Sequence, residues 1–281
     1  MKFAITTPIL DGRDFFRACA ASVAAQRSAD VEVEHFIRES DRSAESCADI
    51  AAQYGCRYFQ GADSGLYDAI QSGLDEAAAS GADILAWLNS DEQYLPGALA
   101  KAAAAFDANP GADFIFGDYL MIAPDTLELL SARREIQALP FFLRHGVDYI
   151  ISCATFFRRE AWLKHRPFDL SYKLVADKKF TYKAFISGAR FRHVSEFFGC
   201  YGSTGKNASL APWAPQDQAR LRAEIGAYKS LNARNAVRAV RLLVKLLAGC
   251  HSKKKISTTL FDSGGRPRAV SATCSGRWVD K

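Results

Sequence analysis

Apolar runs and helical patterns alternate over the first 120 residues. Short apolar runs predict strands at residues 3–5, 31–37, 57–59, 83–88 and 114–116. Between them, apolar residues recur at helical spacing and predict helices at 14–26, 43–54, 65–79 and 96–108. The run DILAWL is apolar almost throughout, as a strand buried on both faces of a sheet requires. This alternation predicts an α/β fold, with a mainly parallel sheet flanked by helices.

The pattern loosens after residue 120. Further strands are expected at 149–157 and 190–194, and further helices at 159–165, 176–187 and within 216–249. Residues 252–281, which begin SKKKISTT, are expected to be poorly ordered. The sequence therefore predicts an α/β domain over 1–215 and a helical, basic appendage over 216–281.

Charge divides the chain at nearly the same place. Residues 1–216 carry a net charge of −5, and residues 217–281 carry +10, from 14 Lys and Arg against 4 Asp and Glu. An acidic body suits a metal or sugar site better than the backbone of a nucleic acid.

The segment 236–249 (AVRAVRLLVKLLAG) predicts an amphipathic helix with an apolar face and a basic face. The apolar face is expected to contain Val237, Val240, Leu243, Val244 and Leu247, and the basic face Arg234, Arg238, Arg241 and Lys245. With the three lysines that follow, residues 236–255 are typical of a helix that lies on an anionic membrane surface. The alternative is a helix packed on the body, with its charged face in solvent.

Several protein classes are excluded by what the sequence lacks. The seven cysteines are scattered, with no C-x-x-C pair, and no H-E-x-x-H occurs, so neither a zinc cluster nor a disulfide framework is indicated. No apolar run is long enough to span a membrane, and the N-terminus turns polar too soon for a signal peptide. We expect a cytoplasmic protein, with attachment to the inner face of the cytoplasmic membrane as the alternative.

Polar side chains follow the predicted strands at the edge where an open parallel sheet binds its ligands. They are Thr6 and Thr7, Glu39 and Asp41, Asp63, and the run Asn89-Ser90-Asp91-Glu92. Neither G-x-G-x-x-G nor G-x-x-x-x-G-K-[ST] is present to hold phosphates directly. Carboxylates at this edge instead favour a divalent metal, Mg²⁺ or Mn²⁺, that carries the phosphates of a ligand.

Seven segments, in order, resemble the motif series of the family 2 glycosyltransferases, which have the GT-A fold. They are TTPILDG, HFIRESDRSAES, GADSGLYDAIQSGLDEA, ADILAWLNSDEQY, FIFGDY, SCATFFRRE and VADKKFTYKAFISGARF. The resemblance spans residues 3–205 and is to bacterial members that build polysaccharides. It implies an inverting, metal-dependent enzyme that moves a sugar from a nucleotide-sugar, UDP-linked, to a lipid-linked or saccharide acceptor.

The resemblance implies roles for residues that would contact the nucleotide-sugar. Thr6, Thr7 and Pro8 would lie against the nucleotide, and Glu39 would contact its base. Asp63 and Asp68 match the segment that flanks the nucleotide.

It also implies the metal and catalytic residues. Asp91 would contact the ribose or a phosphate, and Glu92 would bind the metal, with Asp91 as the next metal candidate. Asp177 matches the acid that acts as catalytic base, and a base is what an inverting transfer needs to take the proton of the acceptor hydroxyl.

Two other functions remain open at the level of sequence. A sugar-phosphate nucleotidyltransferase would share the sheet and the metal, but it would have a glycine-rich loop and a basic residue after the first strand, where this chain has only Gly12 and Arg13. Nucleic-acid binding through the basic appendage would need base-stacking residues, and residues 217–281 hold three aromatic side chains and no RNA-binding motif. We therefore expect no nucleic-acid partner. The sequence names neither the sugar, the acceptor, the linkage nor the oligomeric state.

Overall fold

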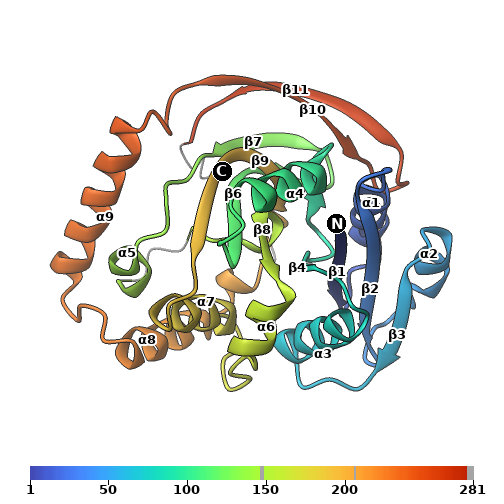
Figure 1. Cartoon of the computed structure of the whole chain (residues 1–281), viewed down its shortest axis with the longest axis horizontal. Coiled ribbons are helices and arrows are strands. Elements are labelled where there is room, and N and C mark those ends of the chain that lie inside the picture. Colours follow the sequence, from blue (N-terminus) through green and yellow to red (C-terminus); the bar gives the residue numbers. More distant parts are fainter. Residues whose placement is uncertain (146–148, 206, 277–281) are drawn as a thin grey trace.

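The computed structural model describes residues 1–145, 149–205 and 207–276. Its strands are β1 (Lys2–Ile9), β2 (Glu32–Ser40), β3 (Arg57–Gly61), β4 (Ile84–Trp87), β5 (Gln93–Tyr94), β6 (Phe114–Ala123), β7 (Glu128–Arg133), β8 (Thr155–Arg158), β9 (Phe191–Gly202), β10 (Lys254–Phe261) and β11 (Pro267–Cys274). Its α-helices are α1 (Arg13–Ala24), α2 (Ala48–Gln53), α3 (Leu66–Ala79), α4 (Ala98–Ala108), α5 (Pro140–Arg144), α6 (Arg159–His165), α7 (Ala176–Ile186), α8 (Ala214–Glu224) and α9 (Leu231–Leu247). Figure 1 shows their arrangement.

Within the described residues, nine strands form one sheet in the order β3-β2-β1-β4-β8-β6-β9-β5, with β7 paired to β6. β1 is parallel to β2 and β4, β2 is parallel to β3, and β6 is parallel to β9. β8 lies antiparallel between β4 and β6, and the short β5 is antiparallel to β9. The predicted mainly parallel sheet is confirmed, and antiparallel strands extend it.

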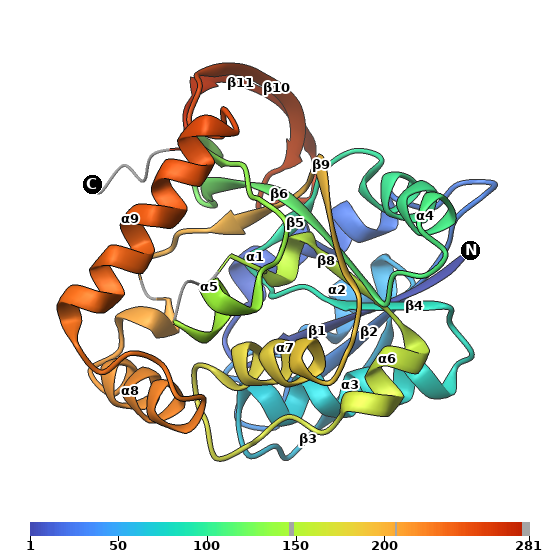
Figure 2. The ribbon, with the colours of Figure 1, turned by 60° about the vertical axis from the view of Figure 1, so that its left-hand side comes forward.

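Helices cover both faces of the sheet (Figures 1 and 2). Because successive side chains of a strand point to opposite faces, β1 supplies both cores. Phe3 packs in one cluster with Phe16 of α1, and Ala4 packs in another with Leu74 of α3 and Phe180 of α7. The sheet is therefore the middle layer of three, and its parallel strands end at a common edge.

Most of the predicted elements are confirmed, with differences where the pattern was loose. The helix expected from residue 43 begins only at Ala48, because the preceding turn donates the Cys47 N–H to the Glu39 carboxylate. The strand expected over 149–157 is a 3₁₀ turn, Ser152–Ala154, followed by β8. The strand expected at 190–194 continues as β9 to Gly202.

The expectation that residues 252–281 are poorly ordered is wrong for the described part of the segment, and residues 277–281 lie outside it. β10 and β11 form an antiparallel hairpin from Lys254 paired with Cys274 to Phe261 paired with Pro267. Leu260 is buried against the edge of the large sheet in a cluster with Leu95 and Leu120. The hairpin gains order by covering an apolar surface of the body, which its own polar sequence does not reveal. The division of the chain at residue 215 stays a prediction.

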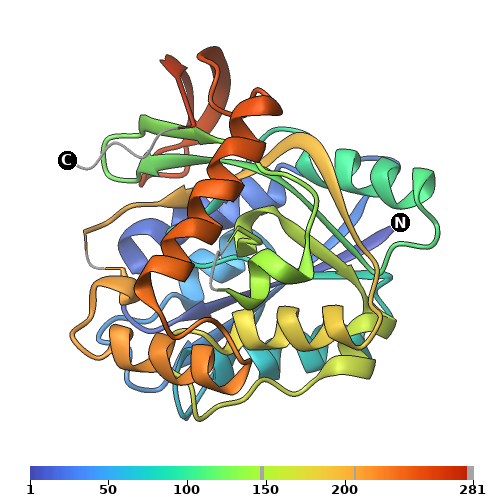
Figure 3. The same ribbon diagram turned by 90° about the vertical axis from the view of Figure 1, so that its left-hand side faces the viewer.

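Helix α9 is amphipathic as predicted and packs on the body, but not with its charged face in solvent as the packed-helix alternative expects. Its basic side chains Arg241 and Lys245 face the body, where both pair with the buried Glu135. Val237 is buried against the body, but the other side chains of the predicted apolar face are exposed, with Leu243 56% exposed and Leu247 80% exposed. Figure 3 shows α9 crossing this side of the molecule with no other helix or strand in front of it. No helix in the described ranges is long and apolar enough to cross a membrane.

Candidate active site

A cavity of about 730 Å³ opens at the edge where β1, β4 and β9 end, and we call it the strand-end cavity. It is lined by residues of several loops and helices, among them Pro8, Asp11, Gly12, Asp14, Tyr67, Asn89, Ser90, Asp91, Tyr119, Arg133, Ser152, Asp177, Lys178, Tyr201, Thr204 and Gln218. The loops after β1 and β4 lie so close that a Cβ at Gly12 would be 2.4 Å from the Ser90 Oγ. Parallel neighbouring strands bring these loops together, as the strand-end rule predicts.

Four carboxylates line the strand-end cavity: Asp11, Asp14, Asp91 and Asp177. Burial raises the pKa of Asp91 to about 6. A carboxylate that is held in partial burial beside an open cavity is stabilised in its charged form by any cation that enters the cavity. Asp91 is therefore the acid of this group whose environment most favours a cation.

The structure places Glu92, the residue expected to bind the metal, behind the wall of the strand-end cavity. Its side chain is fully buried and does not line the strand-end cavity. Its carboxylate accepts hydrogen bonds from the Asn89 N–H at 2.9 Å and the Ser152 Oγ at 2.9 Å. Burial, with the charge of Asp91 adding to it, raises the pKa of Glu92 to about 8. Glu92 therefore fixes the loop after β4 through hydrogen bonds inside the protein, and Asp91 is the acid of the pair that lines the cavity.

Asp177 lies on the cavity wall in the first turn of α7. The Tyr67 hydroxyl donates to the Asp177 Oδ1 at 2.7 Å, and the same hydroxyl lies close to the carbonyl oxygen of Leu174. Helix α3 thereby fixes the orientation of an acid on α7, and the helix N-terminus favours the ionised form of that acid.

The first strand places only one of its three predicted residues on the cavity. Pro8 lines it, whereas Thr6 and Thr7 are fully buried. Thr6 points to α3, where a Cβ at Gly73 would lie 2.3 Å from its Cγ2. Thr7 points the other way and shares a hydrogen bond of 2.8 Å with the His35 Nε2. Thr6 therefore packs against α3 on one face of the sheet, and Thr7 contacts His35 on the other face.

The structure also places Glu39, Asp63 and Asp68 outside the lining of the strand-end cavity. Glu39 is buried and accepts hydrogen bonds from the Cys47 N–H and the Tyr58 hydroxyl through Oε2, while its buried Oε1 has no partner among the described residues. The other two acids order the turn before α3. Asp63 accepts from Arg42 and the Gly65 N–H, and Asp68 accepts from the backbone and hydroxyl of Ser64.

Several cavity residues were missed by sequence reasoning. Asp11 and Asp14 stand just after β1, so the strand-end rule could have found them. Arg133 is the last residue of β7, and Tyr201 lies near the end of β9. No strand was expected at either position. No local signal identifies them, because their position depends on how β6 pairs with its neighbours.

The donor set on the cavity fits a hard divalent cation only in part. No cluster of three or more His, Cys, Asp or Glu side chains in the described ranges forms a ready-made metal site. Mg²⁺ and Mn²⁺ commonly take one or two carboxylates and complete their shell with substrate phosphates and water. Asp91 fits that kind of site.

Solved structures with a similar arrangement are glycosyltransferases of the GT-A fold. TarS 1-349 of S. aureus in complex with UDP-GlcNAc has a TM-score of 0.59 and 17% identity, over 88% of this chain and 73% of that one. Glucosyl-3-phosphoglycerate synthase from Mycobacterium tuberculosis, in complex with Mn²⁺, UDP and phosphoglyceric acid, has a TM-score of 0.58 and 14% identity, over 98% and 88%. The chain spans 44% of a longer TarS chain. At these identities the likeness shows the fold, and the chain has the GT-A fold.

The sequence gives the family. Residues 5–165, more than half of the chain, match Glycosyl transferase family 2, and the chain belongs to this family. A curated relative, the PGL/p-HBAD biosynthesis glycosyltransferase of Mycobacterium tuberculosis, is 27% identical over 208 residues, which cover 68% of this chain and 74% of that protein. The resemblance found in the motifs is confirmed, and membership of this family decides against the nucleotidyltransferase alternative. The expectation of no nucleic-acid partner stays a prediction.

Proposed function

We propose that this glycosyltransferase moves a sugar from a UDP-linked donor to an acceptor hydroxyl, with inversion, in the strand-end cavity. The observation that carries the proposal is that this one cavity has Asp91 on its wall after β4 and Asp177 on its wall at the start of α7. Asp91 binds a cation that neutralises the leaving diphosphate, and Asp177 takes the proton of the acceptor hydroxyl.

Asp177 acts as the general base. Its carboxylate accepts the proton of the acceptor hydroxyl while the hydroxyl oxygen attacks the anomeric carbon and the bond to the diphosphate breaks on the opposite side. The hydrogen bond from Tyr67 to Oδ1 fixes the orientation of the carboxylate on the cavity wall. Tyr67 is thus a positioning residue.

Asp91 is the protein ligand that we assign to Mg²⁺ or Mn²⁺. When bound, such an ion neutralises negative charge that develops on the leaving diphosphate. Asn89, Ser90 and Ser152 line the cavity around Asp91 and supply further oxygen atoms and hydrogen-bond donors for ribose or phosphate groups. UDP is the nucleotide favoured by the complexes of the fold neighbours, whose structures contain UDP or UDP-GlcNAc.

The acceptor that we propose is lipid-linked or a saccharide at a membrane surface, in the synthesis of a cell-surface polysaccharide or glycolipid. Helix α9 supports the lipid-linked form, because Val240, Leu243, Leu246 and Leu247 project from it into solvent. Lys253, Lys254 and Lys255 follow its apolar end and are exposed. An apolar stripe next to exposed cations is what an anionic bilayer binds. The enzyme then works at the inner face of the cytoplasmic membrane.

A thermal-shift comparison of nucleoside diphosphates tests the donor and the metal together. A ligand that binds only the folded state raises the melting temperature by mass action. UDP with Mn²⁺ should raise it more than UDP alone or Mn²⁺ alone, and more than ADP or GDP with Mn²⁺. Equal shifts for all the nucleotides, or none, would contradict the proposed donor.

A further inference from the structure

A second, smaller cavity lies beside the strand-end cavity. It measures about 180 Å³ and is enclosed by α5, α7 and α8, and we call it the helix pocket. Much of its wall is aliphatic, from Leu143, Ile150, Val175, Leu221 and Ile225. Since an apolar cavity of about 150 Å³ holds one benzene ring, the helix pocket has room for a single ring or a short alkyl chain.

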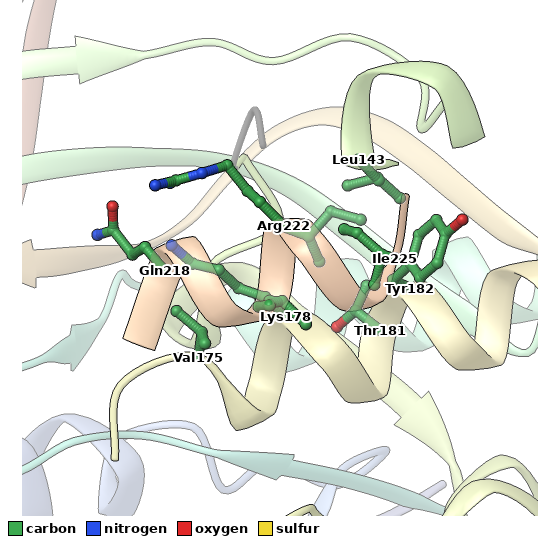
Figure 4. Close-up of a pocket in the computed structure, with 10 residues that line it drawn as sticks. Leu143, Val175, Lys178, Thr181, Tyr182, Gln218, Arg222 and Ile225 are labelled. Atoms are coloured by element: carbon green, nitrogen blue, oxygen red, sulfur yellow. The ribbon is translucent and has the colours of Figure 1, made fainter. Parts of the chain in front are cut away.

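The helix pocket is next to the catalytic machinery. Lys178 and Gln218 line both cavities, and Lys178 follows the proposed base, Asp177, in the sequence. Figure 4 shows the polar ends of Gln218, Lys178 and Arg222 gathered on one side, with Leu143 and Ile225 on the other. A molecule with its apolar part in the helix pocket can therefore extend a hydroxyl toward Asp177.

Arg222 on the rim of the helix pocket belongs to a group of cations that lacks acidic partners. Arg222 is in the last turn of α8, and Arg234 and Arg238 are one turn apart at the start of α9. None of the three forms an ion pair with an acid in the part of the chain that the structure describes, and the Arg234 Nε is buried without a hydrogen-bond partner there. Burial and then the like charges of Arg234 and Arg238 lower the pKa of Arg222, so both arginines of α9 lie near enough to repel its charge.

An anion would offset the repulsion among three such cations. Other cations of the appendage have acidic partners, as Arg241 and Lys245 do in Glu135 and Arg268 does in Asp262. Guanidinium groups bind carboxylate and phosphate in a forked geometry that lysine cannot reproduce. The three arginines thus match an acidic group on a ligand.

We infer that the helix pocket and the three arginines form the binding site for the acceptor, which carries a ring-sized or short-chain apolar group next to a phosphate or carboxylate. The inference rests on the proposed function, and it adds the chemical class of the acceptor. It also gives the appendage a role in substrate selection, since α8 and α9 supply all three arginines.

Phenyl phosphate is a probe that carries both features, with benzyl alcohol and inorganic phosphate as probes that carry one each. Calorimetric titrations of the full chain are made with UDP and Mn²⁺ present, so that the strand-end cavity is occupied. Phenyl phosphate should bind at least about tenfold more tightly than either single-feature probe, because two contacts on one molecule reinforce each other.

Two variants test the two halves of the site. Arg222→Gln should weaken phenyl phosphate binding at least about fivefold, since it removes a charged partner of the phosphate. Ile225→Trp should fill the helix pocket and weaken phenyl phosphate but not inorganic phosphate. Arg266→Gln removes the same charge from the turn of the β10–β11 hairpin and should bind like the parent. Melting curves confirm that each variant is folded, and Arg222→Gln remains decisive if Ile225→Trp does not fold.

The inference is overturned if phenyl phosphate fails to saturate, if UDP displaces it, or if Arg222→Gln and Arg266→Gln bind it equally. These failures are distinct from failure of the proposed function. If UDP does not bind with Mn²⁺ but phenyl phosphate still binds in an Arg222-dependent way, the donor assignment is wrong and the anion site stands.

Discussion

The carboxylate of Asp177 accepts a hydrogen bond from the Tyr67 hydroxyl at 2.7 Å, and this contact makes its role testable with conservative changes. Asp177→Asn keeps the shape and the contact with Tyr67 but removes the basic oxygen. Transfer should fall by about 10²–10⁴-fold, the usual contribution of a general base, while UDP affinity stays within a few-fold.

Tyr67→Phe is the matched variant, since it loses only the hydroxyl that orients the base. It should lower the turnover rate without changing the affinity for UDP. Steady-state transfer assays and UDP titrations measure both, and transfer by Asp177→Asn at more than a tenth of the parent rate would show that the base lies elsewhere.

The adjacent acids Asp91 and Glu92 differ in burial, and we expect them to differ in function. Asp91→Asn should abolish most of the gain in UDP affinity that Mn²⁺ produces, because it removes the anionic oxygen on the cavity wall. Glu92→Gln should leave that gain nearly intact, because the amide can still accept from Asn89 and Ser152. Titrating Mn²⁺ at fixed UDP measures both effects, and a Glu92→Gln variant that no longer responds to Mn²⁺ would return the metal to Glu92.

His35 makes the stability of the fold depend on pH. Burial lowers the pKa of His35 to about 3, so the folded protein keeps it neutral down to strongly acidic pH, whereas the unfolded chain protonates it below about 6.5. The stabilisation is present above pH 6.5 and is lost as the pH falls. From pH 7.5 to 5.5 His35 should lower the free energy of unfolding by about 1.4 kcal/mol. Urea denaturation of the parent and of His35→Gln should differ by this amount in their pH dependence, and identical slopes would contradict it.

For single residues, the sequence predicts which side chains lie near one another better than it predicts which way each side chain points. The acids after β1 and β4 meet because their strands are parallel neighbours, and that follows from the pattern alone. Which of two consecutive side chains faces the cavity does not follow from it, because Thr6 and Thr7, like Asp91 and Glu92, point to opposite sides. The motif resemblance therefore identified the segment that lines the cavity, but it assigned the metal to the buried residue of the pair.

The two faces of helix α9 should affect different properties of the protein. We expect the basic face to affect its stability and the apolar face its binding to membranes. Lys245 is buried against Glu135, with a Nζ–Oε1 distance of 3.0 Å. Lys245→Gln should therefore cost about 2 kcal/mol of stability, because it leaves a buried carboxylate with one cation fewer. Replacing Leu243 and Leu247 together by Ser should leave the melting temperature unchanged, since both side chains are exposed.

The same variants should behave in the opposite way with vesicles that contain phosphatidylglycerol. The Leu243→Ser, Leu247→Ser variant should lose co-sedimentation, and Lys245→Gln should keep it while folded. A dimer in solution that the serine variant dissociates, without any vesicle binding, would assign the apolar face to a second copy of the chain. In that case the membrane proposal would fall.

Sequence could predict that α9 is amphipathic but not which face it presents to the body. A basic face normally faces water, and here the single acid Glu135, which is 106 residues from Arg241 in the chain, reverses the helix. The β10–β11 hairpin was missed for a related reason. Its strands contain few large apolar side chains, and their buried residues are Leu260 and Cys274.

At the scale of the whole molecule, the hairpin completes the edge of the large sheet. The Gln93 side chain donates to the Phe261 carbonyl oxygen at 3.0 Å and accepts from the Phe261 N–H at 2.8 Å. A chain that ends at Gly249 loses these bonds and uncovers Leu95 and Leu120. Its melting temperature should fall by about 5–10 °C.

Gln93→Ala in the full chain is the control for the two hydrogen bonds. It should lower the melting temperature by less than removal of the hairpin does, because the apolar cover from Leu260 remains. If the shortened chain melted at the same temperature as the full one, the hairpin would contribute no cover to the body.

The distance in sequence between Gln93 and Phe261, 168 residues, has a consequence for synthesis on the ribosome. A nascent chain folds from its N-terminal end as it emerges. Strands β1 to β4 can pair early. Glu135 has neither of its two cations beside it until α9 has emerged, and Leu95 stays uncovered until β10 follows. Until α9 and β10 have emerged, the nascent chain therefore has no cation beside Glu135 and no cover over Leu95 and Leu120. That interval is when a chaperone that binds apolar segments would have its substrate.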